Sequence, residues 1–273
     1  MTGSIQGTAS AVATSVTLPA HATGDLILIS ALGSSAPTTP GAGGTVPTWT
    51  LIQSGAADAC GVNTRYAIAT AGNHTSGTWT NATYVQVIVL SGTGVLSVGA
   101  SSTKNANLGA TSHIYPALTL QRTDSTSFGV RIAGKVSGSA AVDNLAAGGA
   151  GETWTMRIFV SGSRFCLHTT SGLTVNPVED TVATAGNSSA YRDHTIEILE
   201  TFVAVDAASN SGYKTASSSY SWAHTCTGSN RYLVVGVSML SVAGSSVSSI
   251  TYNGVNLTMV KAAASVSGAV RAE

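Results

Sequence analysis

The sequence predicts an all-β fold built from tandem β-sandwich or jelly-roll-like modules, the third of them incomplete. Apolar runs of strand length alternate with turn residues along the whole chain of 273 residues. No window longer than about ten residues combines apolar residues at the 3.6-residue helical period with capping residues at its ends. Many short strands separated by turns are typical of sandwiches and jelly rolls.

One order of segments occurs three times along the chain. Repeat one has a Thr-Leu-Pro segment, an apolar run, a Thr-Trp-Thr segment, a run beginning with Arg and a Val-rich run, at 17–19, 24–29, 48–52, 65–68 and 84–90. Repeat two has the same order at 118–120, 127–132, 153–158, 164–167 and 194–199. Repeat three has the segments 221–226, 231–237 and 256–260. The predicted modules are therefore 1–105, 106–203 and 204–273, and such repetition indicates a modular scaffold.

Individual strands and turns follow from local patterns. Segment 84–90 is mostly apolar on both sides, whereas in 195–198 Ile residues alternate with Thr195 and Glu197. Asn253-Gly254 predicts a hairpin, because a type I′ turn needs positive φ at both residues. Segments 96–109 and 207–219 are small and polar, and they join the repeats either as linkers or as strands that lie on a neighbour. Segment 141–151 is expected to hold at most one short turn.

Composition excludes several classes of partner. Charged residues make up 9% of the chain and the net charge is zero, so we expect neither nucleic-acid nor membrane binding, which need clustered Lys and Arg. The apolar fraction of 43% argues against disorder. The N-terminus lacks a basic start and an apolar stretch, so we expect no signal peptide, and the apolar runs are shorter than a membrane span.

None of the local motifs of the common catalytic and metal sites occurs. Gly134-Lys135 is followed by Val136, not by the Ser or Thr of a phosphate loop. No Gly-x-Ser-x-Gly, His-Glu-x-x-His or Cys-x-x-Cys sequence is found. Cys60, Cys166 and Cys226 are far apart and odd in number, and we expect free buried thiols. We therefore expect that the protein is not an enzyme and that it works without a metal or organic cofactor.

Three polar clusters have a functional and a structural interpretation. One face of a strand carries Asp193, Thr195 and Glu197, which are able to hold a cation or a sugar hydroxyl. Charged side chains also prevent unwanted pairing of an edge strand with another strand. We interpret the three residues as the solvated face of an edge strand. Cys166 and His168 share a face without an evident third catalytic group. A third shared face, which we interpret as core, comprises Trp222, His224 and Cys226.

The tryptophans divide into matched and unmatched residues. Trp49 and Trp154 occupy the same place in repeats one and two, so we expect each to fill the core of its own module. Trp79 has no counterpart in repeat two. If it is exposed, Trp79 is a candidate for stacking on a sugar ring with help from Tyr84 and Tyr66. Core packing is the favoured interpretation.

The order of these segments resembles modular β-sandwich proteins of tailed bacteriophages, which occur in minor tail proteins, fibres and head- or neck-attached decorations. The resemblance is carried by 17–19, 24–29, 47–51, 66–72 and 85–92, and again by 218–227 and 255–260. It covers nearly the whole chain. Two features depart from the pattern: Thr48 stands where the pattern often has glycine before the tryptophan, and repeat three lacks closing strands.

This resemblance implies a structural or assembly protein of a virion, formed in the host cytoplasm, whose partners are copies of itself and other virion proteins. The alternative is a carbohydrate- or receptor-binding adhesion module that contacts a host surface glycan. The pattern includes no catalytic residues. We expect the sheet of repeat three to be completed by a second copy of the chain, by another virion protein or by a further part of the same chain.

Overall fold

The computed structural model confirms the all-β fold. It describes residues 4–58, 60–106, 112–135, 152–160, 165–183, 190–201, 206–215, 218–227, 232–239, 246–259, 263–264 and 271–272, and these contain strands and no helix. The predicted short turn at 141–151 lies wholly outside these residues. The chain forms two compact units, unit 1 from Met1 to Val203 and unit 2 from Ala204 to Glu273. The boundary between the units coincides with the predicted end of the second module.

Repeat one forms a five-stranded antiparallel sheet. Its strands are β1 (Ser4–Ala11), β2 (Leu26–Gly33), β3 (Thr50–Ala57), β4 (Cys60–Ile68) and β5 (Tyr84–Ser91). Their spatial order is β1-β5-β2-β4-β3. The central strands β2 and β5 are buried along almost their whole length, which agrees with their apolar residues on both sides.

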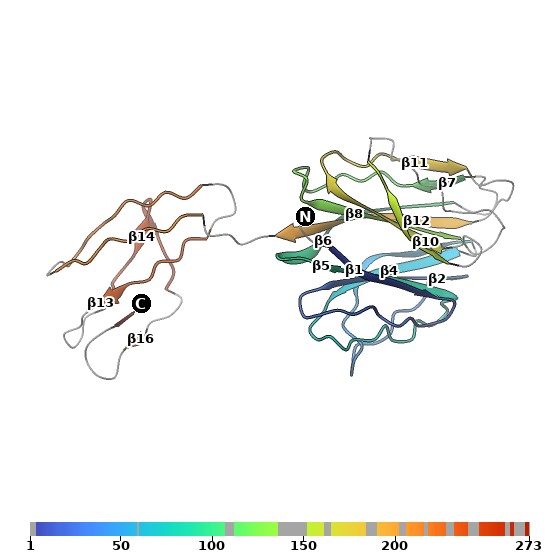
Figure 1. The fold of residues 1–273 in the computed structure, drawn as a ribbon, viewed down its shortest axis with the longest axis horizontal. Helices are drawn as coiled ribbons and strands as arrows, with labels where there is room; N and C mark the ends of the chain where they lie inside the picture. Colours follow the sequence, from blue (N-terminus) through green and yellow to red (C-terminus); the bar gives the residue numbers. More distant parts are fainter. Residues whose placement is uncertain are drawn as a thin grey trace. The chain divides into compact units, whose positions relative to one another are not determined.

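Repeat two forms a second sheet with the equivalent order. Its strands are β6 (Val95–Ala106), β8 (Ser127–Lys135), β9 (Thr155–Val160), β10 (Phe165–Leu173) and β12 (Tyr191–Thr201), in the order β6-β12-β8-β10-β9. A ribbon of β7 (Ser112–Tyr115) and β11 (Asp180–Ala183) is added to this repeat (Figure 1). We expected segment 96–109 to be either a linker or a strand that lies on a neighbour. Most of it belongs to the strand β6.

Strand register makes the two repeats equivalent residue by residue. Leu26 of β2 pairs with Leu90 of β5, as Phe128 of β8 pairs with Ile198 of β12. Both sheets also have an irregularity at the same place in the pairing of their last two strands. Trp49 and Trp154 directly precede these edge strands and are 5% and 4% exposed, so the predicted match and burial of the two tryptophans are confirmed.

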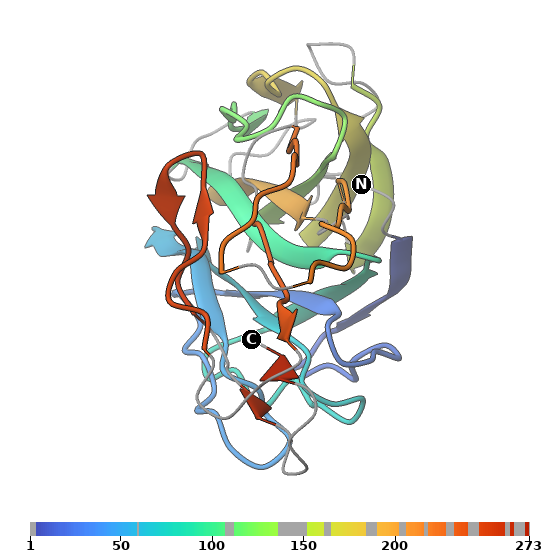
Figure 2. The same ribbon diagram turned by 90° about the vertical axis from the view of Figure 1, so that its left-hand side faces the viewer.

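The two repeats form one sandwich with a shared core, not one sandwich each as we expected for modules 1–105 and 106–203. Figures 1 and 2 show the blue-to-teal strands of repeat one as one layer and the green-to-orange strands of repeat two as the other. The core between the layers includes Leu26, Leu28, Leu32, Val62, Ile88 and Leu90 from repeat one and Phe128, Val130, Ile132, Phe165, Leu167, Ile196 and Ile198 from repeat two. Each sheet alone would leave this apolar face in water, so neither repeat is an independent folding unit.

Contacts between the layers have pseudo-two-fold symmetry. The edge strand β3 of repeat one contacts β6 of repeat two, and the edge strand β9 of repeat two contacts β1 of repeat one. Exchanging the equivalent strands of the repeats converts one contact into the other. The arrangement is therefore the intramolecular counterpart of an isologous dimer interface.

The outer faces of the two layers are covered in different ways. In repeat one, Ile27, Ile29, Val85, Val87 and Val89 pack against Trp49 and Trp79. In repeat two, the ribbon of β7 and β11 lies over residues that are largely polar, as described below. The two equivalent sheets therefore differ on their outer faces: the outer layer is apolar in repeat one and charged in repeat two.

Unit 2 contains short strands and a hairpin. Its strands are β13 (Ser238–Met239), β14 (Thr251–Tyr252), β15 (Val255–Asn256), β16 (Ala263–Ala264) and β17 (Arg271–Ala272). Asn253 and Gly254 have φ values of 49° and 79°, which confirms the predicted hairpin turn. We expected Trp222 to be a core residue, but it is 36% exposed. Its indole Nε1 donates to Ser209 Oγ over 3.1 Å.

Candidate functional site

The aromatic residues proposed for glycan binding do not form an exposed platform. Trp79 is 0% exposed, lies 6.2 Å from the ring of Trp49, and donates its indole Nε1 to the carbonyl of Ser76. Tyr84 belongs to the core between the sheets, and half-buried Tyr66 packs against that core. Trp79 fills the outer layer of repeat one because the Val-rich face of β5 needs an apolar cover. Trp79 therefore has no exposed ring face on which a sugar could stack.

Strand β12 carries the densest charge of the described residues, and it is a central strand, not an edge strand as we expected. It pairs with β6 on one side and β8 on the other, and every residue from Tyr191 to Glu200 is buried. In the register, Asp193, Thr195 and Glu197 stand where repeat one has Val85, Val87 and Val89. These polar residues replace the apolar outer layer, so their partners must come from what covers the sheet.

Glu197 accepts hydrogen bonds from three backbone amides and one hydroxyl. Its Oε2 accepts from the N–H of Ala100 over 3.1 Å and from that of Gln121 over 2.9 Å. Its Oε1 accepts from the N–H of Arg122 over 3.2 Å and from Ser127 Oγ over 2.6 Å. A Cβ on Gly99 would lie 2.6 Å from Oε2, so a residue without a side chain lets β6 approach the carboxylate. Glu197 therefore fixes the segment that leads into β8 against β6.

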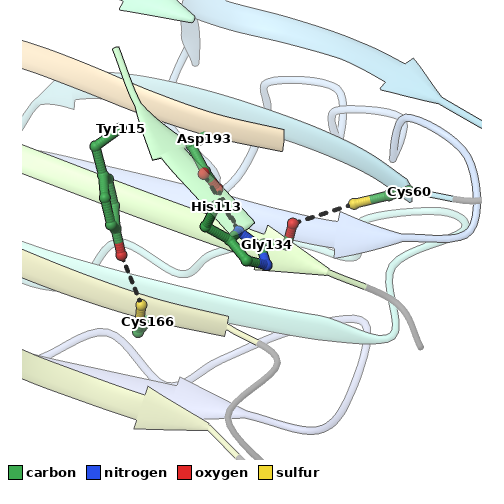
Figure 3. Close-up of polar contacts among 6 residues, drawn as sticks. All are labelled: Cys60, His113, Tyr115, Gly134, Cys166 and Asp193. Carbon is green, nitrogen blue, oxygen red and sulfur yellow. Dashed lines mark hydrogen bonds and ion pairs between the residues drawn. The ribbon is translucent and has the colours of Figure 1, made fainter. Parts of the chain in front are cut away.

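Asp193 contacts the ribbon through His113 of β7. His113 Nδ1 lies 3.3 Å from Asp193 Oδ2 (Figure 3), and both residues are at most 1% exposed. The imidazole of His113 lies 4.5 Å from the ring of Tyr191. Burial raises the pKa of Asp193, an effect that His113 opposes. Burial also raises the pKa of Tyr191 to about 12, with a further contribution from the charge of Asp193.

Further contacts extend this cluster across the outer face of repeat two. Tyr115 of β7 has its hydroxyl 3.4 Å from Cys166 Sγ (Figure 3), and burial raises its pKa well above the ordinary value. The Arg131 guanidinium lies 4.4 Å from the Trp154 ring centroid and donates from Nη2 to the carbonyl of Val178 over 2.7 Å. Burial lowers the pKa of Arg131, an effect opposed by Asp180. These contacts join β7 and β11 to the sheet.

This cluster contains residue types that catalyse reactions in other settings. A histidine held by an aspartate, and a thiol, are components of nucleophilic sites. Here, however, Cys166 contacts Tyr115, and the predicted pair Cys166 and His168 meets at that tyrosine, with the ring of His168 at 6.0 Å. His113, Tyr115, Cys166, His168 and Asp193 are all at most 1% exposed. The arrangement holds a ribbon onto a sheet and presents no reacting group to a substrate.

A second set of polar contacts crosses between the two sheets. His194 Nδ1 lies 2.8 Å from Thr64 Oγ1, which in turn lies 2.8 Å from Ser30 Oγ. Burial, with a smaller effect of Arg192, lowers the pKa of His194 to about 3, so the imidazole is neutral at pH 7. Gln86 Nε2 donates to the carbonyl of Cys166 over 3.2 Å, and Cys60 Sγ donates to that of Gly134 over 3.2 Å (Figure 3). These directional bonds fix the alignment of the layers.

Two grooves on the described part of unit 1 are lined by residues outside the buried polar clusters. A groove of about 480 Å³ lies beside β9 and β10, and its lining includes Glu152, Thr155, Arg157, Thr169 and Thr170. Arg157 Nε donates to Thr169 Oγ1 over 2.9 Å. A second groove of about 390 Å³ is lined by residues 15–18 and 74–78. Hydroxyl groups dominate the first groove, so it suits a polar, uncharged ligand.

The described residues include no group of three or more His, Cys, Asp or Glu placed to hold a metal ion. Cys60 and Cys166 are buried as predicted, whereas Cys226 is half-buried. Within the described part of the chain, no helix is long and apolar enough to span a membrane. Comparison with known proteins found no matching family model, no matching curated protein and no matching solved structure.

Proposed function

We propose that this protein is a structural and assembly component of a bacteriophage virion, in the tail, a fibre or the decoration of the head. The observation that carries the proposal is the use of charged side chains in unit 1. Glu197, Asp193 and His194 bind backbone amides, a covering ribbon and the opposite sheet. A rigid building block needs such internal fixation, whereas an enzyme needs convergent titratable groups that a substrate reaches.

The composition supports the same proposal. Only 9% of the residues are charged, so few charges must be desolvated when the surface packs against neighbouring subunits. The resemblance of the repeats to modular β-sandwich proteins of tailed phages supplies the class of assembly. Repeated sheets that interlock in pairs are a means of building a stiff, chemically inert rod or shell.

Immunogold electron microscopy of purified phage particles tests the proposal. An antibody against unit 1 is expected to label one defined location on each particle, and mass spectrometry of the same particles is expected to find the protein in a fixed ratio to the major capsid protein. Particles of an unrelated phage serve as the control. Absence of the protein from purified particles whose host lysate contains it would contradict the proposal.

Carbohydrate binding is the second candidate, and the hydroxyl-lined groove beside β9 and β10 favours it. The groove has Arg157 at its side and Thr155 and Thr170 in its lining, which supply hydrogen-bond partners for sugar hydroxyls. On a glycan array, this candidate predicts a bound sugar that the Arg157→Ala variant loses. Ala substitution of His74, in the other groove, is the matched control. An array without a bound glycan removes this candidate and leaves the virion proposal untouched.

A further inference from the structure

Repeat three contains the segment that forms the central strand of each layer in unit 1. The sequences Asp25-Leu26-Ile27-Leu28, Ser127-Phe128-Gly129-Val130 and Arg231-Tyr232-Leu233-Val234 align without a gap. In unit 1 the second and fourth residues of this segment face the other repeat. Leu26, Leu28, Phe128 and Val130 all lie in the core between the sheets and are at most 5% exposed. The equivalent residues of repeat three are Tyr232 and Val234.

These two residues are uncovered in unit 2. Tyr232 is 93% exposed and Val234 is 91% exposed. The alternate residues Leu233, Val235 and Val237 are half-buried. Repeat three therefore leaves uncovered the two residues that correspond to those with which repeats one and two bind each other. Exposed large apolar residues of this kind mark interaction surfaces.

We propose that this face pairs with the same face of a second copy of the chain, so that two third repeats form one sandwich between two molecules. The partner is argued from unit 1, where a repeat of this kind binds another about a pseudo-two-fold axis, with β3 on β6 and β9 on β1. Two identical repeats in that geometry form a closed, isologous dimer. Residues 232–238 include no charged residue, so the pairing desolvates no charge there.

This inference does not depend on the place of the protein in a virion, and the mass of the full chain in solution tests it. Light scattering after size exclusion is expected to give twice the single-chain mass of 27.3 kDa. The double variant Tyr232→Asp, Val234→Asp is expected to give the single-chain mass. Met259→Asp is the matched control: Met259 is 70% exposed, and Leu51, its equivalent in repeat one, is itself 52% exposed and outside the core. That variant is expected to remain a dimer.

Thiol labelling identifies which face is covered and avoids a charged substitution. Cysteine in place of Val234 is expected to react with a maleimide at least ten times more slowly than cysteine in place of Met259, with the labelled site assigned by peptide mass spectrometry. The rate at position 234 is expected to rise on dilution below the dissociation constant. A single-chain mass for the native protein overturns the proposal, as does a dimer that survives both aspartates. Protection of position 234 in a monomer also overturns it, because unit 1 or another part of the same chain then covers the face.

Discussion

Replacing Glu197 by Gln is expected to lower the free energy of unfolding of unit 1 by about 3–5 kcal/mol. Glu197 accepts hydrogen bonds from three backbone amides and from Ser127 Oγ. An amide side chain keeps the shape but replaces one acceptor oxygen by an NH₂ group that faces N–H donors. One buried N–H, that of Arg122, loses its partner if the NH₂ group replaces Oε1, and two, those of Ala100 and Gln121, lose theirs if it replaces Oε2. Each stranded donor carries a desolvation cost that water does not offset.

Guanidinium unfolding followed by the fluorescence of the buried tryptophans measures this effect. Glu179→Gln is the control, because Glu179 is about half exposed and pairs with Lys104 on the surface. Surface pairs of this kind contribute about 0–1 kcal/mol. Glu197→Val, which installs the residue found at the equivalent position of repeat one, is expected to destabilise at least as strongly as Glu197→Gln. A loss below about 1 kcal/mol for both Glu197 variants would show that the carboxylate is not the anchor of this segment.

Sequence patterns predicted the strands and the equivalence of the repeats, but not how the repeats associate. The matched segments around Trp49 and Trp154 identified strands with the same position in each sheet, because local alternation and turn residues are visible in the chain itself. Whether a sheet packs on its own cover or on another sheet depends on long-range contacts. Leu26 and Phe128 are apolar in either arrangement, so their pattern does not distinguish two sandwiches from one.

The charged strand shows a signal that was present and was interpreted wrongly. Alternation of Ile196 and Ile198 with Thr195 and Glu197 is the pattern of a strand with one solvated face, and we assigned it to a sheet edge. The repeat alignment, however, equates this segment with 84–90, which is apolar on both sides and therefore central. The partners of these charges, His113 and the amides of residues 121 and 122, come from segments without a counterpart in the alignment, so the cluster itself was not predictable.

The buried polar residues also explain why two nearly equivalent sheets adopt one alignment. An apolar interface between two similar faces tolerates sliding, because contact between aliphatic side chains is not directional. Hydrogen bonds such as Thr64 to His194 and Gln86 to the carbonyl of Cys166 exist in only one alignment. Gln86 and His194 occupy equivalent places in the two repeats, since they pair with Ser30 and Ile132 respectively. Each repeat thus contributes a polar residue at the same position of its central strand.

His194 is expected to make unit 1 lose stability as the pH falls below 6.5. Burial lowers the pKa of His194 from 6.5 in the unfolded chain to about 3 in the folded protein. Between these values the unfolded chain binds a proton that the folded protein does not bind, so the free energy of unfolding rises with pH across this window. The slope is at most about 1.4 kcal/mol per pH unit. The contribution is complete above pH 6.5 and is lost progressively on acidification.

The variant His194→Gln isolates this contribution, because Gln is the residue that repeat one has at the equivalent position and it does not titrate. Denaturant unfolding of both proteins from pH 7 to pH 4 is expected to give curves that converge on acidification, with the native protein falling more steeply. Burial also raises the pKa of Asp193. Asp193 is present in both proteins, so its effect largely cancels in the difference between their unfolding free energies. Parallel curves would mean that the imidazole between the sheets is already charged or reached by water in the folded state. A steeper native curve ties the acid sensitivity of the sandwich to His194, which hydrogen-bonds across its two layers.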